Sequence, residues 1–386
     1  MVPALALFYG GMVRKRNVLS TIMHSMSALP LVSAQWILIG FTLTFASSAS
    51  KAGLIGGLDH LGLTGLPELR GSVPSLAFVA FQMMFAAITP ALISGAFAER
   101  FRFATYLVFT LAWTTLVYDP VAHWVWAEGG WLFKLGALDF AGGTVVHVTA
   151  GVSALVCALV VGKRLKYPHE RPLPHNLTMT LTGAGLLWFG WFGFNAGSAL
   201  AASGVAALAL LTTHAGAAGG ALGWLFVEWA HRKKPTALGV ASGLVAGLVA
   251  VTPAAGFVAP WAALVIGLVG GVGCYGAVLA KYKYGYDDSL DAFGVHGVGG
   301  LLGALLTGVF ADKRLNAAGA DGLFYGGGVR PILIQALACA AAAAYAAVVT
   351  LVLLKILDRT MGLRVAQSDE REGLDTTQHG EDAYAG

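Results

Sequence analysis

Long apolar runs separated by short charged loops dominate the hydrophobic pattern of this chain. Three of these runs contain no Asp, Glu, Lys or Arg: 75–98, 140–162 and 331–354. Each is long enough for a helix to cross a hydrocarbon core about 30 Å thick. The uncharged stretches 172–227 and 235–280 are too long for one crossing, and they contain the breaks AASG at 201–204 and TPAAGFVAPW at 252–261. Each stretch therefore predicts two helices.

Further apolar runs near 18–47, 103–126 and 290–311 bring the prediction to ten full membrane spans. The opening segment MVPALALFYGGMV is too short to span a bilayer, and it lacks the basic leader and small-residue cleavage site of a signal peptide. We interpret it as the inner half of a first helix. The predicted fold class is an all-α polytopic membrane protein with eleven transmembrane helices, the first one truncated.

The distribution of the 24 basic residues predicts the topology. Eighteen lie in alternate loops and in the segment from Lys355 onward, against six in the other loops (Lys51, Arg70, Lys134, Lys313, Arg314 and Arg330). The more basic side is expected to face the cytoplasm. We predict a multi-pass protein of the cytoplasmic (inner) membrane, with its N-terminus outside and its C-terminus in the cytoplasm.

The composition supports the membrane assignment and excludes other classes. Hydrophobic residues make up 57% of the chain and charged residues only 11%, too few charges for a water-facing globular surface of this size. The net charge of +4 is scattered among short loops, so no nucleic-acid partner is expected. Cys157, Cys274 and Cys339 lie inside apolar runs without metal-like spacing, and we predict no metal, cofactor or disulfide.

An Asp precedes a glycine-flanked His twice, with Asp139 before His147 and Asp291 before His296. The two predicted helices run in opposite directions across the membrane, which indicates a five-plus-five inverted repeat with a pore between the halves. The predicted organisation is a transmembrane domain at 1–356, with repeats at about 1–162 and 178–311 and a final helix at about 331–356, and a cytoplasmic tail at 357–386.

Both histidines lie several residues inside their helices and therefore deep in the bilayer. Small residues flank them at helical spacing, which is consistent either with close helix packing or with imidazoles that face a narrow lumen. Ionisable residues paired at mid-depth favour the lumen. Asp139 is expected to cap its helix and to provide a negative field at the outer mouth, and Asp291 is expected to act as a cap alone.

Aromatic residues form a second group of candidates. Trp126 lies at the outer end of one run, Phe81 and Phe85 lie in another, and Trp191, Phe194 and Ser198 lie in a third. Each alone is typical of a lipid-interface anchor or a core residue. Together they are also consistent with an aromatic vestibule that binds a cation.

These motifs resemble the ammonium transporter (Amt/Rh) family, and the bacterial ammonium transporters in particular. The resemblance rests on ALFYGG, GALDFAGGTVVH, WFGFNAGS, FGVHGV and the charged tail, in the same order along nearly the whole chain. It implies a homotrimer with one pore per subunit. Carried over by motif, it implies an ammonium site (Trp126, Phe85, Ser198 and Asp139), an aromatic gate (Phe85 and Phe194), pore histidines (His147 and His296), and a docking segment for a P-II signal-transducer protein from Gly362 to Tyr384.

Physical chemistry favours deprotonation of the substrate in such a pore. A bare ion pays a large desolvation cost in an apolar interior, whereas neutral ammonia avoids it. The expected function is uptake of ammonium, which is recruited outside, deprotonated, and conducted as ammonia past the histidines, with a possible proton relay. The main alternative is an ammonium sensor that signals through its tail. Two histidines without a third ligand make a poor catalytic metal site, so an enzyme is not expected.

Overall fold

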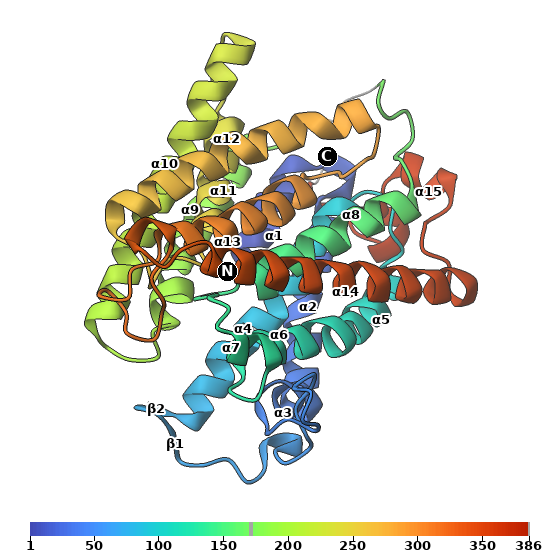
Figure 1. Cartoon of the computed structure of the whole chain (residues 1–386). Coiled ribbons are helices and arrows are strands. Elements are labelled where there is room, and N and C mark those ends of the chain that lie inside the picture. Colours follow the sequence, from blue (N-terminus) through green and yellow to red (C-terminus); the bar gives the residue numbers. More distant parts are fainter. Residues whose placement is uncertain (170–172, 385–386) are drawn as a thin grey trace.

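The computed structural model describes residues 1–169 and 173–384, and the described chain is predominantly helical (Figure 1). Eight helices in these ranges are long and apolar enough to cross a membrane: Lys15–Phe45, Ser75–Ala96, Gly143–Val161, Leu177–Gly197, Gly204–Arg232, Pro260–Tyr284, Phe293–Phe310 and Arg330–Thr360. Val2–Met12 and Ala237–Val251 are shorter apolar helices. The chain is thus a polytopic helical membrane protein, and the total of eleven crossings remains a prediction.

The first half of the chain contains eight α-helices and a small hairpin. The helices are α1 (Val2–Met12), α2 (Val18–Gln35), α3 (Phe41–Phe45), α4 (Ser75–Ile93), α5 (Phe103–Trp113), α6 (Asp119–Trp126), α7 (Trp131–Leu135) and α8 (Thr149–Val161). Strands β1 (Leu69–Arg70) and β2 (Val73–Pro74) pair antiparallel in the loop before α4. Short 3₁₀ segments are η1 (Lys15–Asn17), η3 (Leu61–Leu63) and η4 (Ser94–Ala96), and π-helical segments are η2 (Trp36–Gly40), η5 (Thr114–Tyr118) and η6 (Gly143–Val148).

The second half is also helical and ends in a folded tail. Its helices are α9 (Leu177–Gly197), α10 (Gly204–Arg232), α11 (Ala237–Val251), α12 (Pro260–Tyr284), α13 (Val298–Phe310), α14 (Arg330–Thr360) and α15 (Gln367–Glu372). The shorter segments are η7 (Phe293–Gly297, π-helical), η8 (Leu323–Tyr325, 3₁₀) and η9 (Asp375–His379, π-helical). The breaks expected at 201–204 and 252–261 separate α9 from α10 and α11 from α12. Arg171, counted among the cytoplasmic basic residues, lies outside the described ranges.

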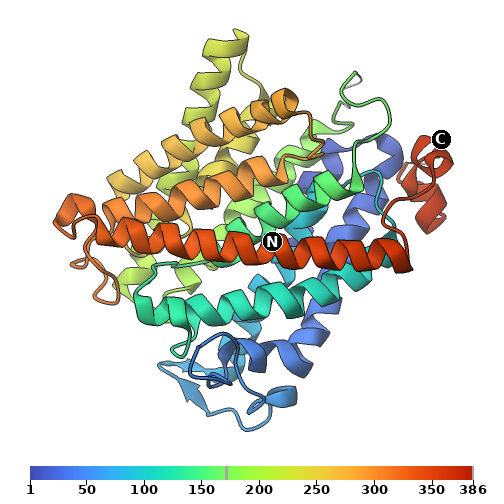
Figure 2. The same ribbon diagram turned by 45° about the vertical axis from the view of Figure 1, so that its right-hand side comes forward.

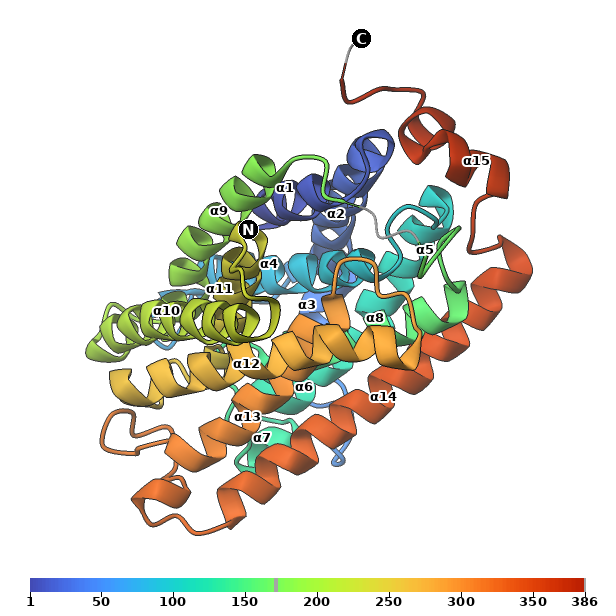
Figure 3. The same ribbon diagram turned by 90° about the horizontal axis from the view of Figure 1, so that it is seen from above.

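Helix α14 lies across the two histidine helices and packs against both α8 and α13 (Figures 1 and 2). Seen from above, α1, α2 and α9 lie on the side of the molecule away from α14 (Figure 3). The histidine helices contact each other between these layers, through α8 with η7 and α13 with η6. Both histidines are therefore enclosed by helices from both halves of the chain.

Glycines allow the two histidine helices to approach each other closely. A Cβ atom on Gly151 would overlap the backbone of Gly297. A Cβ atom on Gly300 would lie 2.8 Å from the carbonyl oxygen of Gly143 and 2.9 Å from the Cβ atom of His147. The close packing expected from small residues is therefore present, and it brings the two histidines together.

Candidate functional site

A cavity of about 120 Å³ opens at the end of α6, on the side that the basic-residue distribution predicts to be the outer one. It is lined by Phe45, Phe78, Gln82, Phe85, Trp126, Phe140, Ser198 and Leu200. We call this cavity the outer vestibule. Three of the residues that the sequence suggested, Phe85, Trp126 and Ser198, meet here, although they come from α4, α6 and the end of α9. Phe81 packs on the Phe85 ring at 5.0 Å and lines a separate apolar cavity.

Two phenylalanine rings close the inner end of the vestibule. The rings of Phe85 and Phe194 are stacked, with centroids 4.0 Å apart and an interplanar angle of 20°. Phe85 also meets Trp126 edge to face, with centroids 5.6 Å apart. Both phenylalanines are buried, so a solute must displace at least one ring to pass inward.

Polar groups at the vestibule have defined partners. The Ser198 hydroxyl donates to the carbonyl oxygen of Phe194 at 2.9 Å, which leaves its oxygen lone pairs able to accept a hydrogen bond from a cation. The indole Nε1 of Trp126 donates to the backbone carbonyl of Asp139 at 2.9 Å. That bond fixes the indole ring, whose π face attracts cations.

Asp139 is held by backbone donors at the start of the first histidine helix. Its two carboxylate oxygens accept hydrogen bonds from the N–H groups of Gly142, Gly143, Thr144 and Val145 at 2.6–3.0 Å. The residue is 8% exposed. Its carboxylate therefore caps the start of the first histidine helix, as expected, and does not itself line the vestibule.

His147 and His296 face each other across the helix crossing. Their Nδ1 atoms are 3.3 Å apart, their ring centroids are 5.3 Å apart, and the rings are nearly parallel at 16°. The ring of Trp191 stacks on His147, with ring centroids 5.5 Å apart. The His147 Nε2 atom has no hydrogen-bond partner among the described residues. The pair is thus a two-ring polar element inside an apolar bundle.

A narrow cavity of about 10 Å³ connects the gate to the histidine pair. Its lining includes Phe194, Trp191, His147 and His296. This volume corresponds to roughly one water-sized molecule. Only a very small solute therefore fits in this cavity.

The expectation that Asp291 caps the second histidine helix is wrong. Asp288 provides that cap, because its carboxylate accepts hydrogen bonds from the N–H groups of Ala292 at 3.0 Å and Phe293 at 2.8 Å. Asp291 has a positive φ of 62° and forms an ion pair with Lys281. Asp139 and Asp288 each precede their histidine by eight positions, whereas Asp291 precedes His296 by five. Asp288 therefore has the same offset and the same capping role as Asp139.

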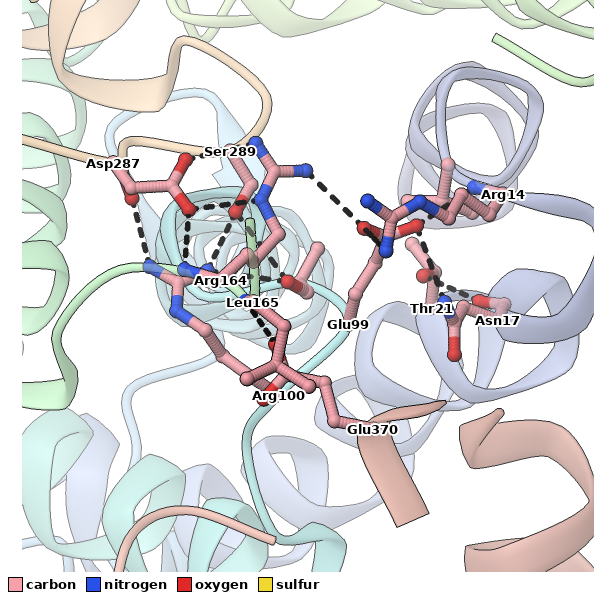
Figure 4. Close-up of polar contacts among 12 residues, drawn as sticks. Arg14, Asn17, Thr21, Glu99, Arg100, Arg164, Leu165, Asp287, Ser289 and Glu370 are labelled. Carbon is pink, nitrogen blue, oxygen red and sulfur yellow. Dashed lines mark hydrogen bonds and ion pairs between the residues drawn. The ribbon is translucent and has the colours of Figure 1, made fainter. Parts of the chain in front are cut away.

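A buried ionic network, which the sequence did not suggest, joins the two halves of the chain (Figure 4). Arg164 contacts Asp287 at 2.8 Å and Glu99 at 3.2 Å, and Arg100 donates to the Asp287 carbonyl at 2.7 Å. Burial favours the neutral Asp287 carboxyl, but hydrogen bonds and charge from Arg164 and the charge of Arg100 lower its pKa to about 2. The members of this network are far apart in the sequence, so the sequence pattern gave no sign of it.

The C-terminal tail is folded against this part of the bundle. Glu370 accepts a hydrogen bond from the Leu165 N–H at 2.7 Å and pairs with Arg364 at 2.7 Å. The Asp375 carboxylate accepts the N–H of Ser20 at 2.8 Å near the start of α2. The tail thus contacts both the Arg164 loop and the first repeat.

No group of three His, Cys, Asp or Glu side chains within 1–169 and 173–384 is arranged to hold a metal ion. The vestibule shares Phe85 with the ring gate, and the narrow cavity shares Phe194 with the gate and extends to the histidine pair. This arrangement is that of a helical membrane protein with an internal pathway for a small solute.

The comparisons with known proteins identify the family. A model of the Ammonium Transporter Family matches residues 1–384, so the chain belongs to that family. The ammonium transporter of Bacillus subtilis is 53% identical, covering 100% of this chain and 95% of the relative, and that of Aquifex aeolicus is 47% identical, covering 99% and 89%. These relatives are named as transporters, and the protein is accordingly a transporter and not an enzyme.

Solved structures show the same fold. The crystal structure of Saccharomyces cerevisiae Mep2 has a TM-score of 0.88 and 39% identity, covering 95% of this chain and 87% of that chain. A structure named Sensor Amt Protein has a TM-score of 0.88 and 30% identity, covering 97% and 94%. The Amt/Mep fold expected from the motifs is confirmed.

Proposed function

We propose that this protein takes up ammonium across the cytoplasmic membrane and conducts it as ammonia. The observation that carries the proposal is the single route from an aromatic vestibule, through the Phe85 and Phe194 gate, to the His147 and His296 pair. The basic-residue distribution supports an outer vestibule, an outer N-terminus and a cytoplasmic tail.

The vestibule suits a small cation and the inner cavity suits a neutral molecule. The Trp126 and Phe85 rings supply cation–π attraction, the Ser198 oxygen supplies an acceptor, and the Asp139 carboxylate beneath them adds a negative field. Beyond the gate the described lining carries no acidic side chain, so a cation that entered would lose most of its stabilisation. Ammonium can lose a proton and continue as ammonia, whereas potassium has no proton to lose.

The histidine pair is placed to accept the proton that ammonium releases. Ammonium becomes ammonia plus a proton at the gate, and the proton moves to a ring nitrogen of the pair while ammonia passes. Imidazole is suited to this exchange because either nitrogen can donate or accept, according to the tautomer. Net movement of one ammonia and one proton carries one positive charge inward.

An ammonium pulse on reconstituted proteoliposomes tests this function. We expect a transient inward current with ammonium and none with potassium at equal concentration. His296→Ala liposomes with matched protein content serve as the control for leakage. Equal currents for ammonium and potassium, or none for ammonium, would contradict the proposal.

We further propose that the protein assembles as a homotrimer. An outward-facing ring of α10 supports self-association: His214, far from both ends of that helix, stacks on Trp188 at 5.2 Å and is exposed. A polar ring facing hydrocarbon is costly, and a second copy of the chain would cover it. Light scattering of the purified protein in detergent should give three protomers, and a monomer would refute this.

A sensor role through the tail is the second candidate function, and the folded tail favours it. The segment from Gly362 to Tyr384 contacts the Arg164 loop and α2, so a partner that binds the tail would act on the end of the bundle opposite the vestibule. We propose a P-II signal-transducer protein as that partner. Deleting residues 365–386 should abolish capture of a purified P-II protein in a pull-down while the oligomer stays intact, and unchanged capture would refute this site.

A further inference from the structure

A resident cation of the protein lies at the lip of the outer vestibule. The guanidinium of Arg70 packs over the ring of Phe78 at 4.5 Å and over the ring of Phe45 at 5.1 Å, measured from Cζ to each centroid. Both distances are within the range of cation–π attraction. Phe45 and Phe78 also line the vestibule. The same two rings therefore serve the protein's own cation and the space that receives the substrate.

The backbone around Arg70 holds the guanidinium in this position. Arg70 pairs with Val73 in the short hairpin of β1 and β2, just before α4 begins. At the hairpin turn the Ser72 hydroxyl donates to the carbonyl oxygen of Leu200 at 3.3 Å. Leu200 itself lines the vestibule. The hairpin is thus attached to the vestibule wall on two sides.

We propose that Arg70 sets the affinity of the outer vestibule for cations, as a built-in competitor of the substrate. This inference rests on the proposed function, because it assumes that the vestibule receives ammonium. Arg70 occupies ring faces that would otherwise attract ammonium, and its permanent charge repels any cation that enters. Ammonium is left with Trp126 and Phe85 as its aromatic partners.

The charge of Arg70 is only partly offset by its surroundings. The carboxylate of Glu128, in the loop that follows α6, is near enough to stabilise the charged guanidinium, but no hydrogen bond or ion pair joins the two within the described chain. Apolar walls strengthen the field of a nearby charge in the vestibule, and mobile salt weakens it over a Debye length of about 10 Å at 0.1 M. Neutral ammonia does not respond to this field. Arg70 therefore acts on recruitment of the cation and not on passage beyond the gate.

Half-saturation of the ammonium-evoked current, measured in proteoliposomes at low and high ionic strength, tests the proposal. Arg70→Gln removes the charge and shortens the side chain while keeping it polar, so we expect the half-saturating ammonium concentration to fall about threefold to tenfold at low salt. The difference from the wild-type protein should shrink at high salt. Arg70→Lys keeps the charge but loses the planar group that stacks on the rings, so its half-saturating concentration should lie between those of Arg70→Gln and the wild-type protein.

A matched control separates the charge from the position of the hairpin. Ser72→Ala removes the hydrogen bond to Leu200 but leaves Arg70 charged, so we expect the half-saturating ammonium concentration of the wild-type protein. A shift in Ser72→Ala as large as that in Arg70→Gln would overturn the proposal, as would an unchanged or raised half-saturation in Arg70→Gln at low salt. Equal melting temperatures of the variants in detergent establish that they are folded.

A binding measurement keeps this inference separate from the transport proposal. Detergent-solubilised protein is titrated with ammonium, and the change in tryptophan fluorescence is recorded. The part of this change that disappears in Trp126→Leu reports binding in the vestibule. Arg70→Gln should bind ammonium more tightly in this assay even if no current is found in liposomes. Equal ammonium affinity of Arg70→Gln and the wild-type protein would refute the role of Arg70. Absence of an ammonium-evoked current would refute only the transport function.

Discussion

Removal of one imidazole from the histidine pair is the most direct test of how charge moves through this protein. We consider His147→Ala and His296→Ala separately. In each variant one ring remains, with its Nδ1 atom no longer 3.3 Å from a partner. Proton transfer between rings requires that contact, whereas ammonia requires only an open path.

The geometry gives the size of the effect. The ring centroids are 5.3 Å apart, so deleting one ring leaves a gap well beyond the roughly 3 Å reach of a hydrogen bond. Loss of that bond costs about 1 to 3 kcal/mol. Added to the barrier for proton transfer, this energy corresponds to a fall in rate of roughly fivefold to 160-fold. The free energy of unfolding falls by the same roughly 1 to 3 kcal/mol, a loss small enough for a bundle of this size to remain folded.

The assay compares current with the amount of folded oligomer. Each variant is reconstituted, and the ammonium-evoked current is divided by the oligomer content from size-exclusion chromatography. Trp191→Phe is the matched control, because it keeps an aromatic ring next to His147 but deletes the hydrogen bond from Nε1 to Thr252. We expect the control to keep most of its current and both histidine variants to lose theirs.

Two results would refute this reasoning. Full normalised current in both alanine variants would show that the proton does not pass through the pair. A low yield or dissociated oligomers, with the current per folded oligomer preserved, would show that the histidines serve only helix packing.

Three further predictions follow from other parts of the molecule. Trp126→Leu removes one aromatic partner of the cation and should raise the half-saturating ammonium concentration about threefold to thirtyfold. A fall in maximal current without that shift would show that Trp126 is a structural anchor and not part of the binding site. Gly151→Ala places a methyl group against the backbone of Gly297 and should lower both the melting temperature and the current. Wild-type values of both would contradict the close contact of the two histidine helices at this position. Asp287 has a lowered pKa, so its pairing with Arg164 stabilises the fold above pH about 4 by roughly 2 kcal/mol, and this stability is lost as pH falls towards 2. Asp287→Asn should therefore melt lower than the wild-type protein at neutral pH, with the difference shrinking as pH falls below about 4; a constant difference would contradict the charge pairing.

Apolar length and loop charge were sufficient to predict the polytopic helical class and the positions of the breaks. The breaks near 201–204 and 252–261 were visible because Gly, Pro and Ser interrupt uncharged runs too long for one crossing. The histidines and vestibule residues were also recognisable, because ionisable and aromatic groups stand out in such runs. Their mutual distances required the fold.

One error overlooked a spacing that the sequence contains, and the other omissions depend on contacts that the sequence does not encode. The Leu-Asp pair before His296 suggested Asp291 as the cap, but Asp288 has the same eight-residue offset as Asp139 and holds the helix start. The contact of Arg70 with Phe45 and Phe78 depends on how a loop folds back. Arg164 was counted only as a topology signal, although it is buried between Asp287 and Glu99.

The glycine crossing of the two histidine helices also limits the kinetics of the protein. Gly151 meets the Gly297 backbone and Gly300 meets Gly143 without intervening side chains, so the halves have no compressible layer on which to rock against each other. The moving parts are then the rings of the gate and not the two halves of the chain. Turnover should accordingly show a small activation enthalpy, closer to that of diffusion through a pore than to that of a carrier that rearranges its domains.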